Sequence, residues 1–296
     1  MDLSQVLLQP PILNLICKNL TIEEANEFRQ ALNLESLKCS ITVDDRDGQI
    51  LSLKEVDQNT ILIYHNILKY GSKKFLNLAV IKNNLPLIRF LVHNGSDVNM
   101  PDRNNMTNLM IASERGYTEV VRFLLTKNPN INEKSTTFND RYTALMFASK
   151  YGYDEIVKLL LEHYADVNIT DQFNTTALMI ASQNGRYKVV KLLLATNEAI
   201  NSVNLIGYSA LMLAMQYDER EIVDLFLQNF LNIDVNDHNG LSNLNEASKY
   251  GYDKVVKYLL EHGANVNFID QNGKTALTWA LEKNHSKIIE MLQKIS

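Results

Sequence analysis

Apolar residues in most of this chain follow the spacing of helix faces, and two distant stretches repeat almost the same pattern. Residues 152–168 read GYDEIVKLLLEHYADVN, and residues 251–267 read GYDKVVKYLLEHGANVN. In a further stretch, Val121, Leu124 and Leu125 lie three and four residues apart, so they share one helix face. The pattern therefore predicts amphipathic helices that recur along the chain.

The interval between recurrences is about 33 residues, stretched to about 36 before residue 143. A Thr or Ser marks each step: Thr107, Thr143, Thr176, Ser209, Ser242 and Thr275. The same interval aligns leucines and alanines: Leu109, Leu145, Leu178, Leu211, Leu244, Leu277, and Ala112, Ala148, Ala181, Ala214, Ala247, Ala280. One structural unit is thus used several times. We expect the Thr or Ser to cap the first helix of each unit, because its oxygen can accept an unpaired backbone N–H.

Turn residues follow both helices of a unit. The first turn has Gly116, Gly152, Gly185 and Gly251, replaced in two units by Asp218 and Asn284. We predict left-handed backbone there, which costs Gly least and Asn or Asp little. After the second helix, Tyr164 and Phe230 stand where other units have Gly or Asn, and they should be strained or turned differently. We predict that the second helices are capped by Thr118, Asp154 and Asp253.

Residues 143–168 (TALMFASKYGYDEIVKLLLEHYADVN) and 275–295 (TALTWALEKNHSKIIEMLQKI) resemble the ankyrin-repeat family. The resemblance covers about residues 72–296 and implies an all-α ankyrin-repeat solenoid of about seven units, each a turn and two antiparallel helices. The first unit, 74–99, is degenerate, since Lys74 replaces the capping Thr and Asn83 replaces the Gly. We therefore expect a repeat domain over 72–296, and from the fold we expect a monomer.

Residues 1–71 do not follow the interval and predict a small, mostly helical N-terminal subdomain. Its segment 7–37 gives two short helices whose spacing resembles the F-box motif. The matching positions are Leu8, Ile12, Leu13, Ile16, Leu20, Phe28 and Arg29. The motif's proline is displaced by one or two residues, and no tryptophan cluster follows. The resemblance implies docking on a Skp-type adaptor of a cullin ubiquitin ligase. The alternative is a plain capping subdomain that covers the first repeat.

Composition restricts the functional classes. The formal net charge is −5 with a pI near 5.7, and no Lys- or Arg-rich run occurs, which disfavours nucleic-acid binding. The two cysteines, Cys17 and Cys39, have no metal-ligand spacing and indicate a reducing compartment. No apolar run is long enough to span a membrane, and the N-terminus does not resemble a signal peptide. We therefore expect a cytoplasmic protein.

No pattern in the sequence supports catalysis. The histidines are scattered, and His163 and His262 share one repeat position near the end of the second helix. There they are expected at exposed helix ends, not at a metal site. Phosphate loops, nucleophile elbows and zinc-protease motifs are missing from the sequence. We expect no enzyme activity, no cofactor and no metal site.

Binding is the better prospect, and two sets of residues are candidates. In the ankyrin family the residue before the first turn lines the concave side, and this position holds Arg115, Tyr151, Asn184, Tyr217, Tyr250 and Lys283. The hairpin tips supply a second set, Tyr142, Phe173 and Tyr208, with Ile206 beside them. Tyrosine is over-represented among binding hot spots, so we expect a protein-binding stripe. The alternative is that each tyrosine packs on a neighbouring helix.

These features predict a non-enzymatic protein–protein interaction module. If the F-box resemblance holds, the repeats bind a target protein and the chain is the substrate receptor of a Skp–cullin–F-box ubiquitin ligase. Such a combination looks like proteins of giant amoebal viruses and intracellular bacteria, which would place it in a host-cell cytoplasm. The alternative is a plain ankyrin scaffold or inhibitor whose N-terminus only caps the repeats.

Overall fold

The computed structural model describes residues 72–93, 95–102, 104–136, 141–198, 200–228 and 242–295. Within these ranges the regular structure is α-helix, with isolated bridges at Thr170–Thr176 and Val203–Ser209. The predicted F-box-like positions and the rest of 1–71 lie outside the described residues, as does Phe230. The boundary between residues 71 and 72 therefore stays a prediction.

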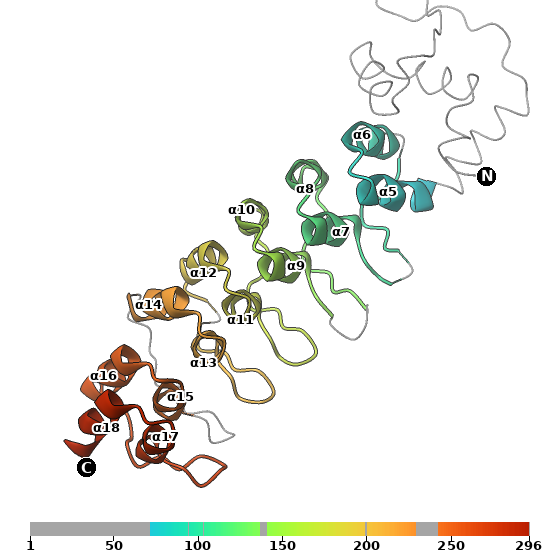
Figure 1. The fold of residues 1–296 in the computed structure, drawn as a ribbon. Helices are drawn as coiled ribbons and strands as arrows, with labels where there is room; N and C mark the ends of the chain where they lie inside the picture. Colours follow the sequence, from blue (N-terminus) through green and yellow to red (C-terminus); the bar gives the residue numbers. More distant parts are fainter. Residues whose placement is uncertain are drawn as a thin grey trace, which may run out of the picture. The chain divides into compact units, whose positions relative to one another are not determined.

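The helices come in consecutive pairs, each joined by a short turn (Figure 1). The pairs are α5 (Ser72–Ile81) with α6 (Leu85–His93), α7 (Asn108–Arg115) with α8 (Thr118–Leu125), α9 (Ala144–Tyr151) with α10 (Asp154–Glu162), α11 (Ala177–Gln183) with α12 (Tyr187–Leu194), α13 (Ala210–Gln216) with α14 (Arg220–Gln228), α15 (Asn243–Tyr250) with α16 (Asp253–Glu261), and α17 (Ala276–Glu282) with α18 (Ser286–Gln293). The described residues thus hold seven helix pairs, which confirms the predicted fold class and number of units.

The chain divides into two compact units. The first comprises residues 1–103, 107–112 and 119–129, and in it α5 packs against α6. Leu76, Val80 and Ile88 are fully buried there. The second comprises 104–106, 113–118 and 130–296, and it carries most of the candidate site.

In the second unit the helix pairs stack side by side. The first helices contact one another in the order α9, α11, α13, α15 and α17, and contacts also join α10 to α12, α12 to α14 and α16 to α18. The aligned alanines, such as Ala148, Ala181 and Ala214, are completely buried. Their small side chains let neighbouring first helices approach closely. The repeated Leu and Ala positions therefore form a continuous core shared between pairs, as expected when one repeat cannot bury both of its faces alone.

The predicted caps of the first helices are confirmed. The hydroxyl oxygens of Thr143, Thr176, Ser209, Ser242 and Thr275 each accept a hydrogen bond from the backbone N–H three residues later, at 3.2–3.3 Å. The predicted caps of the second helices are wrong, because Thr118, Asp154 and Asp253 are each the first residue of their helix. The N-caps before the two aspartates are Tyr153 and Tyr252, and neither makes a side-chain capping bond. The carboxylates instead place negative charge in the first turn, where it is favourable.

Within the second unit, hydrogen bonds from the turn of one pair join it to the pair before it. The residue after the turn reaches back to the preceding turn: Arg186 Nε donates to Lys150 O at 3.0 Å, and the Tyr252 hydroxyl donates to Asp218 Oδ1 at 3.0 Å. A Cβ on Gly152 would lie 2.8 Å from Arg186 Cδ. Glycine is therefore needed there both for its positive φ and for the close approach of the next pair.

The ends of the second helices also follow the predictions. Tyr164 has φ +64°, the strained conformation expected where other units place Gly or Asn. Next to it, His163 Nδ1 lies 2.9 Å from Leu159 O, and His262 Nδ1 lies 2.8 Å from Tyr258 O. Both histidines thus satisfy carbonyl groups at a helix C-terminus, which is the structural role expected for them.

Candidate functional site

The predicted stripe falls at equivalent places in the structure. Tyr151 and Tyr250 are the last residues of α9 and α15, and Tyr217 follows α13 directly. The other members hold the same place at the ends of their helices: Arg115 on α7, Asn184 on α11 and Lys283 on α17. We call the surface formed by these first-helix ends and the described turn residues before α9, α11, α13 and α17 the first-helix face.

The three tyrosines of the stripe differ in exposure. The side chains of Tyr151 and Tyr217 are 41% and 49% exposed, whereas Tyr250 is half-buried. The Tyr217 hydroxyl accepts a hydrogen bond from Gln183 Nε2 at 2.9 Å, and the Tyr151 ring lies 6.1 Å from the ring of Tyr153. Each ring therefore packs partly on the protein and still offers an open edge to solvent.

The tip residues split into two groups. Phe173 is 53% exposed, and the backbone N–H of Leu205 donates to its carbonyl at 2.9 Å, so these two tips are adjacent. Leu205 and Ile206 are more than 60% exposed, and together with Phe173 they form an apolar tip patch. Tyr142 and Tyr208 are half-buried instead, and Tyr142 packs its ring edge-on against Phe147. Phe173 and Ile206 were expected at the tips from the sequence, whereas Leu205 was not.

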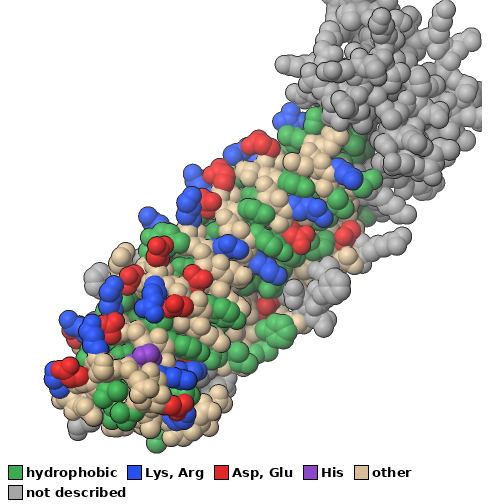
Figure 2. Space-filling model, viewed as in Figure 1, with side chains coloured by type: hydrophobic (Ala, Val, Ile, Leu, Met, Phe, Trp, Pro, Cys, Tyr) green, Lys and Arg blue, Asp and Glu red, His purple; other side chains and the backbone are tan. Residues whose placement is uncertain are grey.

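Charged groups are distributed differently. On the face of the second unit seen in Figure 2, Lys, Arg, Asp and Glu side chains gather over α10, α12 and α14, while hydrophobic side chains lie more toward the turns. Ion pairs such as Lys188–Asp154 and Lys254–Asp224 join neighbouring second helices at exposed positions. Exposed pairs of this kind contribute little to stability, so the charged edge is best understood as a solvated surface.

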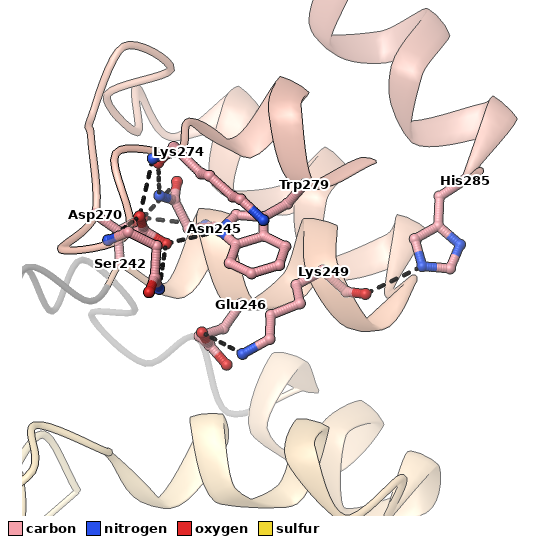
Figure 3. A network of polar contacts seen from close by, with 9 residues as sticks. Ser242, Asn245, Glu246, Lys249, Asp270, Lys274, Trp279 and His285 are labelled. Atoms are coloured by element: carbon pink, nitrogen blue, oxygen red, sulfur yellow. Dashed lines mark hydrogen bonds and ion pairs between the residues drawn. The ribbon is translucent and has the colours of Figure 1, made fainter. Parts of the chain in front are cut away.

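One part of the first-helix face contains a polar network that the sequence analysis did not find. The Glu246 side chain on α15 is only 2% exposed, and its Oε1 accepts a hydrogen bond from Lys249 Nζ at 3.3 Å (Figure 3). Its second oxygen, Oε2, has no hydrogen-bond partner. Burial raises the pKa of Glu246, and the nearby ammonium of Lys249 opposes this only in part. A buried carboxylate with one unpaired oxygen is costly.

The ammonium of Lys249 also faces aromatic rings. Its Nζ lies 4.8 Å from the ring centre of Tyr250 and 5.1 Å from that of Trp279 on α17. Burial is the largest single influence on the pKa of Lys249 and lowers it, but Glu246, Tyr250 and Tyr208 together outweigh burial, so the net shift of this pKa is upward. Burial, reinforced by the charge of Glu246, raises the pKa of Tyr208. Lys249 is therefore held as a cation by Glu246 and the neighbouring tyrosines.

A second part of the network fixes the turn before α17. The Trp279 indole N–H donates to Asp270 Oδ2 at 2.7 Å, and the backbone N–H of Lys274 donates to Asp270 Oδ1 at 2.9 Å (Figure 3). Burial by itself raises the pKa of Asp270, but these hydrogen bonds hold it below its usual value. Asn245 donates to Lys274 O at 3.1 Å from the neighbouring helix. The network thus joins the last two helix pairs through side-chain and backbone hydrogen bonds.

A signal for this network exists in the sequence. The position of Glu246 is apolar in the other aligned units, where it holds Ile111, Phe147, Ile180, Leu213 and Trp279. A carboxylate at a repeat position that is otherwise apolar indicates either an exposed side chain or a buried polar group with its own partner.

Within the described ranges no group of three or more His, Cys, Asp or Glu residues could hold a metal ion. In the same part of the chain no helix combines the length and the apolar character needed to cross a membrane.

Comparisons with known proteins agree with this architecture. A model of the family described as "Ankyrin repeats (3 copies)" matches residues 76–171, 165–239 and 226–295. The Notch-regulated ankyrin repeat-containing protein of Xenopus tropicalis is 31% identical over 84 residues, which is 28% of this chain and 74% of that protein. The human protein of the same name has the same identity and coverage.

Among solved structures, the human ASB11 ankyrin repeat domain superposes with a TM-score of 0.60. The match covers 75% of this chain and 97% of that domain at 23% sequence identity, so it supports the fold alone. Stacked helix pairs, capped first helices and left-handed turns agree with the family match over most of the chain. The chain belongs to the ankyrin-repeat family, whose members serve as protein–protein interaction modules.

Proposed function

We propose that this protein binds a target protein on the first-helix face of its second unit and carries out no reaction itself. The observation that carries the proposal is the placement of Tyr151, Tyr217 and Tyr250 at the same end of α9, α13 and α15, each with part of its ring open to solvent. A tyrosine offers a large contact area and a polar tip at low entropic cost, which suits it to an interface.

The apolar tip patch of Phe173, Leu205 and Ile206 supports the same proposal. These side chains belong to the turns before α11 and α13, and each is more than half exposed. Large apolar side chains gathered at adjacent tips are typical of binding surfaces, because burying them against a partner is favourable. We therefore expect the target to contact both the tyrosines and these tips.

Affinity purification from a eukaryotic cell extract tests this proposal. We expect the full chain to retain a reproducible set of proteins, and the Tyr151/Tyr217/Tyr250 triple alanine variant to lose them. Tyr164→Ala is the matched control, because that tyrosine is 90% exposed but lies at the end of a second helix, away from the first-helix face. Retention of the same partners by the triple variant would refute the proposal.

For the N-terminal segment we propose docking on a Skp-type adaptor of a cullin ubiquitin ligase in the cytoplasm, with the chain as substrate receptor. The support is the spacing of Leu8, Ile12, Leu13, Ile16 and Leu20 in residues 7–37. Co-purification of Skp and cullin that is abolished by Ile12→Asp with Leu13→Asp would agree with it. Failure to recover them, or recovery that is unaffected by the two changes, would remove the ligase role.

The competing proposal is a plain scaffold or inhibitor whose N-terminus caps the first repeat. Deletion of residues 1–56 separates the two. A capping role predicts repeats that lose solubility and melt earlier, because the apolar face of the first pair becomes exposed. A docking role predicts repeats that stay folded and lose a single partner.

A further inference from the structure

Two lysines hold the same repeat position but have different surroundings. Lys150 on α9 and Lys249 on α15 both lie in the sequence Ala-Ser-Lys-Tyr-Gly-Tyr-Asp. The Nζ atom of Lys150 lies 5.4 Å from the ring centre of Tyr142 and 5.8 Å from that of Tyr151. Three residues earlier on its helix stands Phe147, where α15 has Glu246.

The electrostatic consequence is that Lys150 lacks the counter-charge that Lys249 has. Among the described residues no carboxylate forms an ion pair with Lys150, whereas Lys249 pairs with the buried Glu246 at 3.3 Å. Aromatic rings attract an ammonium through their negative faces, but they also displace part of its water. Lys150 is a half-buried residue whose ammonium lies near two rings, so it is placed to gain from an added carboxylate.

We propose that Lys150, Tyr142 and Tyr151 form a socket for a single Asp or Glu side chain of the target protein. The inference rests on the proposed function, and it names the chemistry of the residue that the first-helix face selects at α9. The carboxylate would accept hydrogen bonds from Lys150 Nζ, and the ring edges would pack against its methylene groups. In this position the carboxylate would form an ion pair with Lys150, as Glu246 does with Lys249.

The neighbouring positions favour a peptide carboxylate over a polyanion. The same repeat position holds Glu114 on α7 and Gln183 on α11. In the two adjacent units this position is thus acidic or neutral, and the whole chain carries a net charge of −5. A nucleic-acid backbone needs several aligned cations, because its affinity comes from neutralising successive phosphates. One carboxylate at a fixed position of a peptide needs only one.

Selection from a library of displayed random 16-residue peptides tests the socket with the full chain as bait. We expect the enriched peptides to share an Asp or Glu at one fixed place in their common motif. The bias should disappear for Lys150→Gln and persist for Lys150→Arg, which keeps the charge. Lys158→Gln is the control, because that lysine lies exposed on α10. A labelled enriched peptide should bind Lys150→Gln about tenfold more weakly in fluorescence anisotropy.

The outcomes separate this inference from the proposed function. Peptides that require Tyr151, Tyr217 and Tyr250 but show no acidic position would refute the socket and leave the proposed function standing. Lack of any peptide that distinguishes wild type from the triple alanine variant would count against both. An acidic bias that survives Lys150→Gln, or stronger competition by a single-stranded RNA decamer than by the acidic peptide, would also overturn the socket.

Discussion

Helices α9 and α15 end in the same residues and begin with different ones. Both finish with Ala-Ser-Lys-Tyr, but α9 starts Ala-Leu-Met-Phe and α15 starts Asn-Leu-Asn-Glu. In α9 the Phe147 side chain is buried and supports the Tyr142 ring at 5.4 Å. In α15 the buried Glu246 holds Lys249 beside Tyr250 and Trp279.

The difference shows how one repeat position can serve two purposes. Around Lys249 the protein has its own carboxylate, and the cost of burying it is offset in part by the ion pair. Around Lys150 the core is apolar and the charge is left for an external group. Variants that exchange or remove these features will test whether one side chain at the start of the helix decides the role of the lysine.

The largest effect is expected when the buried aromatic residue of α9 is given the charge found in α15. Phe147→Glu removes an aromatic side chain that is 6% exposed and buries a carboxylate near Lys150. We expect the free energy of unfolding to fall by about 3 kcal/mol or more, measured by urea denaturation followed by circular dichroism. Phe147→Leu should cost about 1 kcal/mol. Equal losses for both variants would show that packing alone matters at this position.

The next largest difference in stability is expected between variants that remove Lys249 and variants that remove Lys150. Lys249→Met leaves Glu246 buried without a counter-charge, and we expect a loss of about 2–3 kcal/mol at neutral pH. Lys150→Met breaks no ion pair, so its loss should stay within about 0.5 kcal/mol. Adding Glu246→Leu to Lys249→Met should recover most of the stability, since Leu213 already holds this position in α13. A similar loss for both single variants would contradict the assigned difference between the lysines.

A smaller loss of stability is expected from substitutions at the turns, where the pair α9–α10 and the pair α15–α16 should behave alike. A Cβ on Gly251 would lie 2.8 Å from His285 Cε1, at φ +82°. We expect Gly251→Ala and Gly152→Ala each to cost about 2 kcal/mol, from backbone strain plus the contact with the next pair. Gly263→Ala is the control, because its φ is +80° but no atom lies within 4 Å of its Cβ position. It should cost only about 1 kcal/mol, from strain alone.

The smallest effect concerns pH. Because burial raises the pKa of Glu246 above its ordinary value of 4.5, the folded chain keeps this proton where the unfolded chain has lost it. Stability from this group is therefore greatest at low pH and is lost as pH rises from 4.5 through the folded pKa. Glu246→Gln should flatten this fall of stability in urea titrations between pH 4.5 and 7.

The pKa values of two aspartates are shifted in the direction opposite to that of Glu246, and both aspartates are unchanged in Glu246→Gln. The hydrogen bond from Lys287 lowers the pKa of Asp253, and the bonds from Lys274 and Trp279 outweigh burial to lower that of Asp270. The stability that these aspartates contribute to the fold is present above their ordinary pKa of 3.8 and is lost as pH falls. Both remain in the variant, so the difference between the two titrations reports Glu246. A steeper fall of stability with pH in Glu246→Gln would contradict the raised pKa.

The local features of the repeats could be predicted from the sequence because they depend on neighbouring residues. Thr143, Thr176 and Ser209 cap their helices through bonds that span three residues. The positive φ of Gly152 and Tyr164 follows from where the helices must end. The interval itself indicated which leucines and alanines form the core. The wrong caps, Asp154 and Asp253, differ from the true ones by one residue, a distinction that spacing does not resolve.

The sequence by itself determined the helix pairs, their order and their capped ends, since these depend on residues close together in the chain. Only the tertiary structure decided which charges are balanced inside the protein and which face outward. The bonds that lock one turn to the next join residues 34 or 36 positions apart, such as Tyr252 with Asp218 and Arg186 with Lys150. The burial of Glu246 was likewise decided by packing, because the interval aligns the pairs and their apolar core but does not show which polar side chains that core encloses.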